Sequence, residues 1–353
     1  MIKYKLSRTQ TAWARWLALW FFSFLTVVLL VPWLLVHIPA GRDAASRVSD
    51  SKQSQTLPPG GQAIMVQVHL SGKQTTEEIE LESYVTGVVA AEMPIEFEPE
   101  ALKAQALAAR TYIVRRLLEG ETAYASGSGA AVTDTTLHQV YVSDEELKHR
   151  WGAEQYEVNR NKLKQAVEAT RDRVITYKGQ PIEASYFSTS NGYTENSEDY
   201  WNMKLPYLRS VPSPWDARLS PRYQDSLTLT SKELQQKLGL PVAVPAIAGS
   251  KLGLNVVERS EGHRVKRLTV GGKSFTGREF REKLGLPSSQ FQWSYSNGKW
   301  TFTTTGYGHG VGMSQWGANG MAKEGRTAEE IVKYYYTGVE LDHVANLWKG
   351  KTF

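Results

Sequence analysis

An uncharged stretch near the N-terminus limits what this 353-residue chain can fold into more than any other feature. It runs from residue 16 to residue 41 and is rich in Leu, Val, Phe and Trp. A helix rises about 1.5 Å per residue, so about 20 apolar residues cross the hydrocarbon core of a membrane. We therefore expect residues 16–41 to form a transmembrane anchor.

The charges beside this stretch predict its orientation. Residues 1–15 contain four basic residues and no acidic one, which favours a cytoplasmic tail under the positive-inside rule. The alternative is a cleaved signal peptide, but its apolar core is normally only about 7–15 residues long. Residues 42–62 are polar and include Pro-Pro-Gly-Gly, which is typical of a tether. The sequence thus predicts a single-pass protein of the cell membrane with its folded domain outside.

The composition of the remainder excludes several classes of protein. The chain has 41 Lys and Arg against 36 Asp and Glu, and four of the basic residues lie in the tail. The part after the tail is therefore nearly neutral, which argues against a nucleic-acid-binding domain. The chain has no cysteine, which excludes a disulfide scaffold, a Cys-ligated zinc and a cysteine nucleophile.

The pattern of residues 63–345 predicts one extracytoplasmic domain of the α+β class, with helices and mostly antiparallel strands. Apolar residues alternate over 63–70, as in a half-buried strand. A helix after residue 82 is expected to end near Glu92 or Met93, because Pro94 follows. A second helix is expected to begin at Pro99 and to end at Gly120.

Further local signals divide the rest of this domain. Ser143 with Glu146 three residues later is a capping box, which opens a long polar helix to about residue 170. Residues 174–177 and 182–188 are expected to form a hairpin. The motif Lys-Leu-Gly-Leu-Pro occurs at 237–241 and 283–287 and is typical of a Schellman helix stop. These two short helices and the strands between them predict a smaller subdomain at about 225–295.

Familiar catalytic motifs are missing from the sequence. No His-x-His or His-Glu-x-x-His is present, and the segment around Ser314 breaks Gly-x-Ser-x-Gly at its last position. The densest unusual segment is 306–320, which holds six glycines interleaved with Tyr307, His309 and Gln315. Glycine lets the backbone approach another group closely. The segment is either a tight turn whose polar groups are satisfied internally or one wall of a binding groove.

A second candidate segment follows the strand that ends near residue 188. Its hydroxyl, amide and aromatic groups suit a carbohydrate, which offers hydroxyls to bond and apolar faces to stack. The alternative is an ordinary Asn-Gly hairpin turn. The residues that we single out are Ser188, Ser190, Asn191, Gly192 and Tyr193.

Glu92 is the best candidate for a catalytic acid. It lies at the end of an apolar helix, where loss of solvent raises the pKa of a carboxyl group and keeps it protonated nearer neutral pH. Arg110 lies eighteen residues further on and could face the same groove, where it would hold an anionic group. The alternative for Arg110 is a salt bridge on a helix.

Four segments in the same order resemble the family of stage II sporulation protein D, which includes the bacterial amidase-enhancer proteins. The segments are AAEMP with EALKAQALAARTYI, TDTTLHQVY, YFSTSNGYTENSEDYW and GYGHGVGMSQWGANGMA. The resemblance covers about residues 63–345, and the N-terminal anchor fits it too. It implies a peptidoglycan lytic transglycosylase that cuts the MurNAc–GlcNAc bonds of glycan strands, preferably strands stripped of stem peptides.

The resemblance also implies a setting, partners and residue roles. The protein would act at the septum during engulfment in sporulation, beside stage II sporulation proteins P and M. The catalytic glutamate of the family falls on Glu92, the arginine of the following helix falls on Arg110, and the groove walls fall on 188–192 and 307–312. Some relatives bind zinc through His and Cys near the Gln-Val-Tyr segment. This chain has His138 there but no cysteine, so we expect neither a metal nor another cofactor.

Two other functions stay open at this point. The first is a non-catalytic glycan-binding protein that activates a cell-wall amidase. The second is a hydrolytic glycosidase, which requires a second carboxylate such as Glu198 or Asp199. A lytic transglycosylase needs only one carboxyl group, and its 1,6-anhydro-MurNAc product distinguishes it from both.

Overall fold

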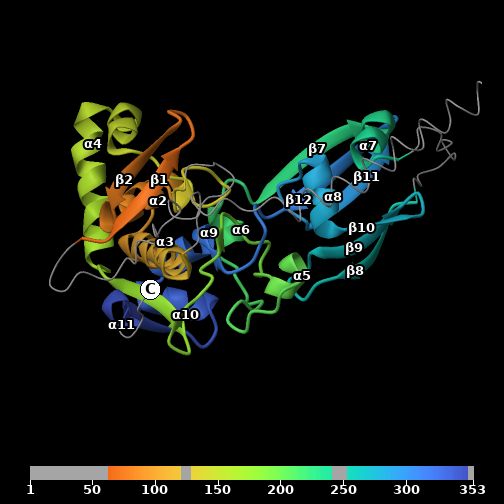
Figure 1. Cartoon of the computed structure of the whole chain (residues 1–353). Coiled ribbons are helices and arrows are strands. Elements are labelled where there is room, and N and C mark those ends of the chain that lie inside the picture. Colours follow the sequence, from red (N-terminus) through yellow and green to blue (C-terminus); the bar gives the residue numbers. More distant parts are fainter. Residues whose placement is uncertain (1–62, 121–128, 241–252, 349–353) are drawn as a thin grey trace, which may run out of the picture. The chain divides into compact units, whose positions relative to one another are not determined.

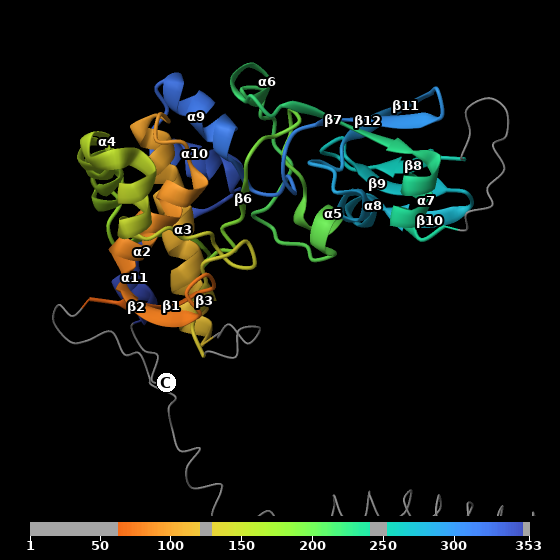
Figure 2. The same cartoon turned by 90° about the horizontal axis from the view of Figure 1, so that it is seen from above.

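The computed structural model describes residues 63–120, 129–240 and 253–348. It has the α+β class that the sequence predicts, with helices and mostly antiparallel strands (Figures 1 and 2). The expected tail, anchor and tether, residues 1–62, lie outside the described residues. Within the described ranges, no helix combines the length and the apolar character of a membrane span.

A long helix lies at the centre of the first hydrophobic core. This helix, α3 (Pro99–Glu119), contacts α2, α4, β4, α9 and α10, and Figure 2 shows it among them. Its buried face carries many alanines, whose small side chains let the neighbouring elements approach closely. Pro99 is its first residue, and Gly120 ends it with a positive φ of 65°. Both ends are therefore where the sequence predicts them.

Seven further described helices accompany α3 in this part of the chain. They are α2 (Leu81–Glu92), α4 (Asp144–Glu168), α9 (Gln315–Lys323), α10 (Ala328–Tyr335) and the short α5 (Ser197–Trp201), α6 (Asp216–Leu219) and α11 (Val344–Trp348). Ser143 caps α4 by accepting from the backbone N–H of Glu146. Gly152 interrupts α4 with a φ of 70°, so the single long helix expected from the sequence is kinked there.

Three small sheets complete the first core. β1 (Met65–Leu70) pairs antiparallel with β2 (Thr75–Glu80) and parallel with β3 (Val132–Thr133). β4 (Arg173–Tyr177) lies between β5 (Gln180–Pro181) and β14 (Glu340–His343). The expected hairpin of 174–177 with 182–188 is only partly present. β6 (Tyr186–Phe187) pairs instead with β13 (Met313–Ser314), in parallel.

A second hydrophobic core lies between two three-stranded antiparallel sheets and two helices (Figure 1). The strands are β7 (Gln224–Thr230), β8 (Asn255–Arg259), β9 (Val265–Val270), β10 (Lys273–Thr276), β11 (Phe291–Ser296) and β12 (Lys299–Thr305), and the helices are α7 (Ser231–Leu238) and α8 (Gly277–Leu284). Phe280 stacks on Phe291 at 5.0 Å and meets the edge of Phe302 at 5.7 Å. The core thus includes β12, which lies beyond the expected limit of 295 because it pairs with both β7 and β11.

The two short helices of this second core end as the repeated motif predicts. Gly239 and Gly285 follow α7 and α8 with φ values of 62° and 74°. The next residue of each closes the Schellman bond: Leu240 N–H donates to the carbonyl of Gln235 and Leu286 N–H to that of Arg281, both at 2.9 Å. Local capping therefore accounts for the repeat.

Candidate active site

Three segments that are far apart in the sequence meet at the carboxyl group of Glu92. Glu92 is the last residue of α2 and is half-buried. The side-chain amide of Gln315, at the start of α9, donates to Glu92 Oε2 at 3.3 Å. The Tyr186 side chain and the Val140 backbone also lie close enough to the carboxyl group to lower its pKa. The parallel pairing of β6 with β13 brings Tyr186 and Gln315 to the same place.

The start of α9 is fixed against the loop that follows Glu92. Trp316 meets the ring of Phe97 edge-on, with 4.7 Å between ring centroids. The side-chain oxygen of Asn319 accepts from the backbone N–H of Glu98 at 2.9 Å. These contacts hold Gln315 over the end of α2.

Burial raises the pKa of the Glu92 carboxyl above that of an ordinary glutamate. The hydrogen bonds from Gln315, Val140 and Tyr186 act in the opposite direction, because they stabilise the ionised form, but burial is the larger effect. The group therefore keeps its proton closer to neutral pH than an exposed glutamate does. That is the property that a general acid needs.

Two further polar side chains lie behind Tyr186. The Gln139 amide nitrogen donates to Tyr186 Oη at 3.3 Å, and Tyr84 Oη donates to Gln139 Oε1 at 3.2 Å. The Tyr84 ring is stacked on Tyr141 with 5.6 Å between centroids. Our sequence analysis did not single out Tyr84, and it gave Gln139 and Tyr186 no role of their own, although both lie in segments that carry the family resemblance. Tertiary pairing is what assembles the group.

The hydroxyl-rich segment after β6 is largely tied into the protein. Ser190 Oγ donates to the Ser213 carbonyl at 2.8 Å, and Asn191 Nδ2 donates to the Gly262 carbonyl at 2.8 Å. Gly192 has a φ of 106°, a left-handed value that favours glycine. Ser188 and Gly192 are half-buried and Tyr193 is 38% exposed, so these three are the predicted groove residues of this segment that remain accessible.

Tyr307 and the glycines beside it pack closely against other parts of the chain. Tyr307 exchanges two backbone hydrogen bonds with Thr189, at 2.7 and 3.0 Å, and the Arg222 guanidinium lies 4.0 Å above its ring. A Cβ at Gly310 would lie 2.3 Å from Arg264 Cζ, and one at Gly312 would lie 2.0 Å from the Ser185 carbonyl oxygen. Close packing therefore explains these two glycines, as the tight-turn interpretation requires.

His309 is surrounded by three aromatic rings and has no hydrogen bond to Glu92. Its ring centroid is 5.7 Å from those of Phe187 and Tyr200 and 5.5 Å from that of Trp201. Burial and the nearby arginines, Arg281 first, lower the pKa of His309 to about 3, so the ring is neutral. Its Nδ1 accepts from the Val311 N–H at 3.1 Å. This ring supports the strand that carries Tyr186.

The structure does not bring Arg110 to Glu92. The Arg110 side chain is fully buried and its Nη2 lies 2.5 Å from Glu82 Oε2. The other guanidinium bonds go to the Thr170 hydroxyl and to the carbonyls of Val167 and Arg173, each at 3.2 Å. The guanidinium is thus enclosed between α2, the end of α4 and β4, in the salt bridge that was the alternative to a groove position.

The carboxylates considered for a hydrolytic mechanism are held in ion pairs. The hydrogen bonds from Arg209 lower the pKa of Glu198 to about 2. Asp199 Oδ1 lies 2.8 Å from the ammonium group of Lys266. Neither carboxylate hydrogen-bonds the groups that surround Glu92, so the cluster contains a single carboxyl group among the residues that the structure describes.

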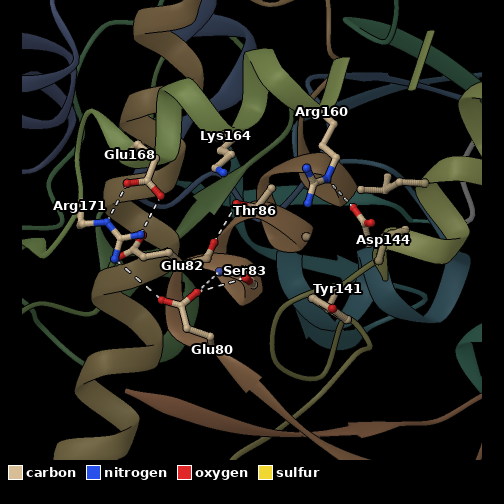
Figure 3. Close-up of a pocket in the computed structure, with 13 residues that line it drawn as sticks. Glu80, Glu82, Ser83, Thr86, Tyr141, Asp144, Arg160, Lys164, Glu168 and Arg171 are labelled. Atoms are coloured by element: carbon tan, nitrogen blue, oxygen red, sulfur yellow. Dashed lines mark hydrogen bonds and ion pairs between the residues drawn. The ribbon is translucent and has the colours of Figure 1, made fainter. Parts of the chain in front are cut away.

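A separate charged hollow of about 350 Å³ lies between α2 and α4, and Glu92 is not part of its lining (Figure 3). Its carboxylates pair with neighbouring cations: Asp144 with Arg160 at 2.9 Å and Glu168 with Arg171 at 2.7 Å. Arg171 holds the pKa of Glu168 below its usual range, and for Asp144 the bonds from Tyr156 and Arg160 outweigh burial in the same direction. Ionised carboxylates cannot donate a proton, so this hollow is a poorer candidate than the Glu92 cluster.

Comparison with known proteins identifies the family of this chain. A family described as Stage II sporulation protein matches residues 70–177. The chain is 47% identical to stage II sporulation protein D of Bacillus subtilis (strain 168), over 89% of this chain and 92% of that protein. It is 46% identical to the protein of the same name from Bacillus amyloliquefaciens, with the same coverage. It is 29% identical to the amidase enhancer of B. subtilis, over 72% of this chain and 40% of that protein. The chain therefore belongs to the stage II sporulation protein D family.

Proposed function

We propose that this protein is a peptidoglycan lytic transglycosylase in which Glu92 is the catalytic acid and then the base. The observation that carries the proposal is the Glu92 carboxyl itself: burial raises its pKa, and the Gln315 amide, from a distant segment, donates to it. Its relatives named stage II sporulation protein D support a role in sporulation, and the relative named amidase enhancer supports a role at the cell wall.

The reaction uses one carboxyl group twice. Glu92 gives its proton to the glycosidic oxygen between MurNAc and GlcNAc as the bond from that oxygen to C1 of MurNAc breaks. The resulting carboxylate takes the proton of the MurNAc C6 hydroxyl, and that oxygen bonds to C1. The products are a 1,6-anhydro-MurNAc end and a free GlcNAc hydroxyl, and Glu92 is again protonated. No water is consumed and no second carboxylate is needed, unlike in a hydrolytic glycosidase.

The proposal extends to substrate and partners. The glycan strand, preferably stripped of stem peptides, would contact the predicted groove residues that keep exposed surface, namely Ser188, Tyr193, Tyr307 and His309. The buried Ser190, Asn191 and Gln315 would shape the surface from behind. In the cell the protein would act in septal remodelling during engulfment, beside stage II sporulation proteins P and M.

Product analysis tests this function directly. We expect the protein from residue 43 onward to release anhydro-MurNAc ends from peptide-free glycan strands, detected by mass spectrometry. Glu92→Gln keeps the shape of the side chain but removes the acidic proton, so activity falls by roughly 100-fold or more. Glu96→Gln, at an exposed position, is the matched control and keeps its activity.

Two results would contradict this proposal, and each would indicate a different function. If neither intact peptidoglycan nor stripped strands yield products while glycan binding persists, the protein is an activator, and an amidase assay with and without it follows. The amidase enhancer relative is the reason to keep that candidate. Reducing ends in place of anhydro ends would indicate a hydrolase.

A further inference from the structure

We propose that Tyr84, Gln139 and Tyr186 form a one-directional hydrogen-bond chain that ends on Glu92 and stabilises the carboxylate left after its proton departs. Tyr186 and the two residues behind it are then positioning residues. The proposal rests on the proposed role of Glu92 as the acid. The chain itself is a property of the fold that is measurable without any reaction.

The direction of the chain is set at its buried end. Tyr84 is fully buried, and its hydroxyl lies 3.2 Å from Gln139 Oε1. An amide oxygen only accepts, so the Tyr84 hydroxyl must donate. With its oxygen engaged in this way, the amide of Gln139 presents its nitrogen to Tyr186 Oη at 3.3 Å. That nitrogen only donates, so the second step has the same direction as the first.

The last step follows from the single hydrogen of a phenol. Gln139 occupies one lone pair of the Tyr186 oxygen, so the Tyr186 hydrogen is available, and in the proposed arrangement it is donated to the neighbouring Glu92 carboxyl. Among the described residues, the Gln315 amide also donates to this carboxyl, at 3.3 Å. In the proposed arrangement, both side chains that bond the carboxyl are therefore donors.

This arrangement has two consequences for proton transfer. Because the bonded protein groups all donate, the hydrogen of a protonated Glu92 is left for an acceptor on a bound ligand. Once it has left, the carboxylate is surrounded by oriented donors, and hydrogen bonds to a charged group are about twice as strong as those to a neutral one. The hydrogen-bond chain thus lowers a pKa that burial alone would set higher, which helps Glu92 to release its proton as well as to hold it.

The neighbouring titratable groups keep the chain in its donating form. Burial, followed by the charge of Glu92, raises the pKa of Tyr186 well above that of a free tyrosine. Burial also raises the pKa of Tyr84, and the smaller effects of Tyr112, Tyr141 and Glu92 act in the same direction, whereas the charge of Arg116 lowers it. Both hydroxyls therefore stay protonated throughout the neutral range.

Two Tyr-to-Phe substitutions, each of which removes one hydroxyl, test the hydrogen-bond chain, and a third serves as the control. The full-length protein in detergent is titrated by infrared spectroscopy, and the protonated Glu92 band is assigned by its absence in Glu92→Gln. Tyr186→Phe should raise the pKa of Glu92 by roughly one pH unit. Tyr84→Phe should raise it by less, although Tyr84 does not hydrogen-bond Glu92. Tyr334→Phe, which removes a hydroxyl bonded to the Pro212 carbonyl, should leave it unchanged.

The outcomes separate the chain from the proposed function. An unchanged or lowered Glu92 pKa in Tyr186→Phe overturns the proposal, and so does a change in Tyr186→Phe with none in Tyr84→Phe. If Tyr186→Phe fails to fold, Tyr84→Phe decides alone. If the pKa rises as expected but the wild type cuts no glycan, the chain stands and the lytic function fails. In an active enzyme, the fall of activity at high pH should move upward with the pKa of Glu92.

Discussion

At the scale of single residues, the raised pKa of Glu92 links the stability of the fold to pH. In the unfolded chain this carboxyl has an ordinary pKa of about 4.5. Between that value and the higher value of the folded state, the folded protein holds more protons. Its free energy of unfolding therefore decreases as the pH rises through this window.

Glu92→Gln removes this dependence because an amide does not ionise. We expect the melting temperature of the variant, minus that of the wild type, to increase from pH 4 to pH 8. Calorimetry at a series of pH values measures it. Other buried carboxyls, such as Asp216, are common to both proteins and cancel in the difference. A constant difference across the series would contradict the raised pKa.

Arg110 gives a second prediction at this scale. Its loss leaves Glu82, whose side chain is 4% exposed, as an unpaired buried charge. Arg110→Met should reduce the free energy of unfolding by about 3–5 kcal/mol, measured by urea denaturation. Adding Glu82→Gln should restore much of the loss, because no buried charge remains. Unchanged glycan affinity in the folded double variant would support a purely structural role for Arg110.

At the scale of elements, α9 contains a glycine whose role conflicts with helix propensity. Alanine is favoured over glycine by about 1 kcal/mol in a helix interior. At Gly320, however, a new Cβ would lie 2.2 Å from the Cβ of Trp215, just before α6. We therefore expect Gly320→Ala to destabilise the protein by about 1–3 kcal/mol in denaturant titrations. Gly72→Ala, where the space is open, is the control and should change stability little.

The sequence predicted the elements whose limits are set locally. Pro94, Gly120 and the two Gly-Leu-Pro stops act through their own backbone and side chains, and the helices end where these residues predict. The kink at Gly152 was missed because glycine is tolerated in a helix and nothing nearby marks it as a break.

Features that depend on distant partners could not be predicted in the same way. The pairing of β6 with β13 joins residues more than a hundred positions apart, and the sequence favoured a local hairpin instead. The buried position of Glu92 was predictable from the apolar residues around it. Its donors Tyr186 and Val140 were not, because only that long-range pairing and the fold around it bring them together.

At the scale of the whole molecule, the N-terminal stretch is predicted to determine where the domain works. We expect the full-length protein to stay in the membrane pellet after alkaline carbonate extraction, because residues 16–41 are long enough to span the bilayer. A protein that starts at residue 43 should appear in the supernatant. Release of the full-length protein by carbonate would contradict the anchor.

The distance along the chain between Glu92 and Gln315 also determines when the site can exist. They are 223 residues apart, and the whole second core is made between them. During synthesis α2 emerges early, but the strand and helix that complete the cluster come near the end of the chain. A protein interrupted anywhere in the second core would carry Glu92 without Gln315. The order of synthesis thus delays assembly of the acid site until the whole second core has been made.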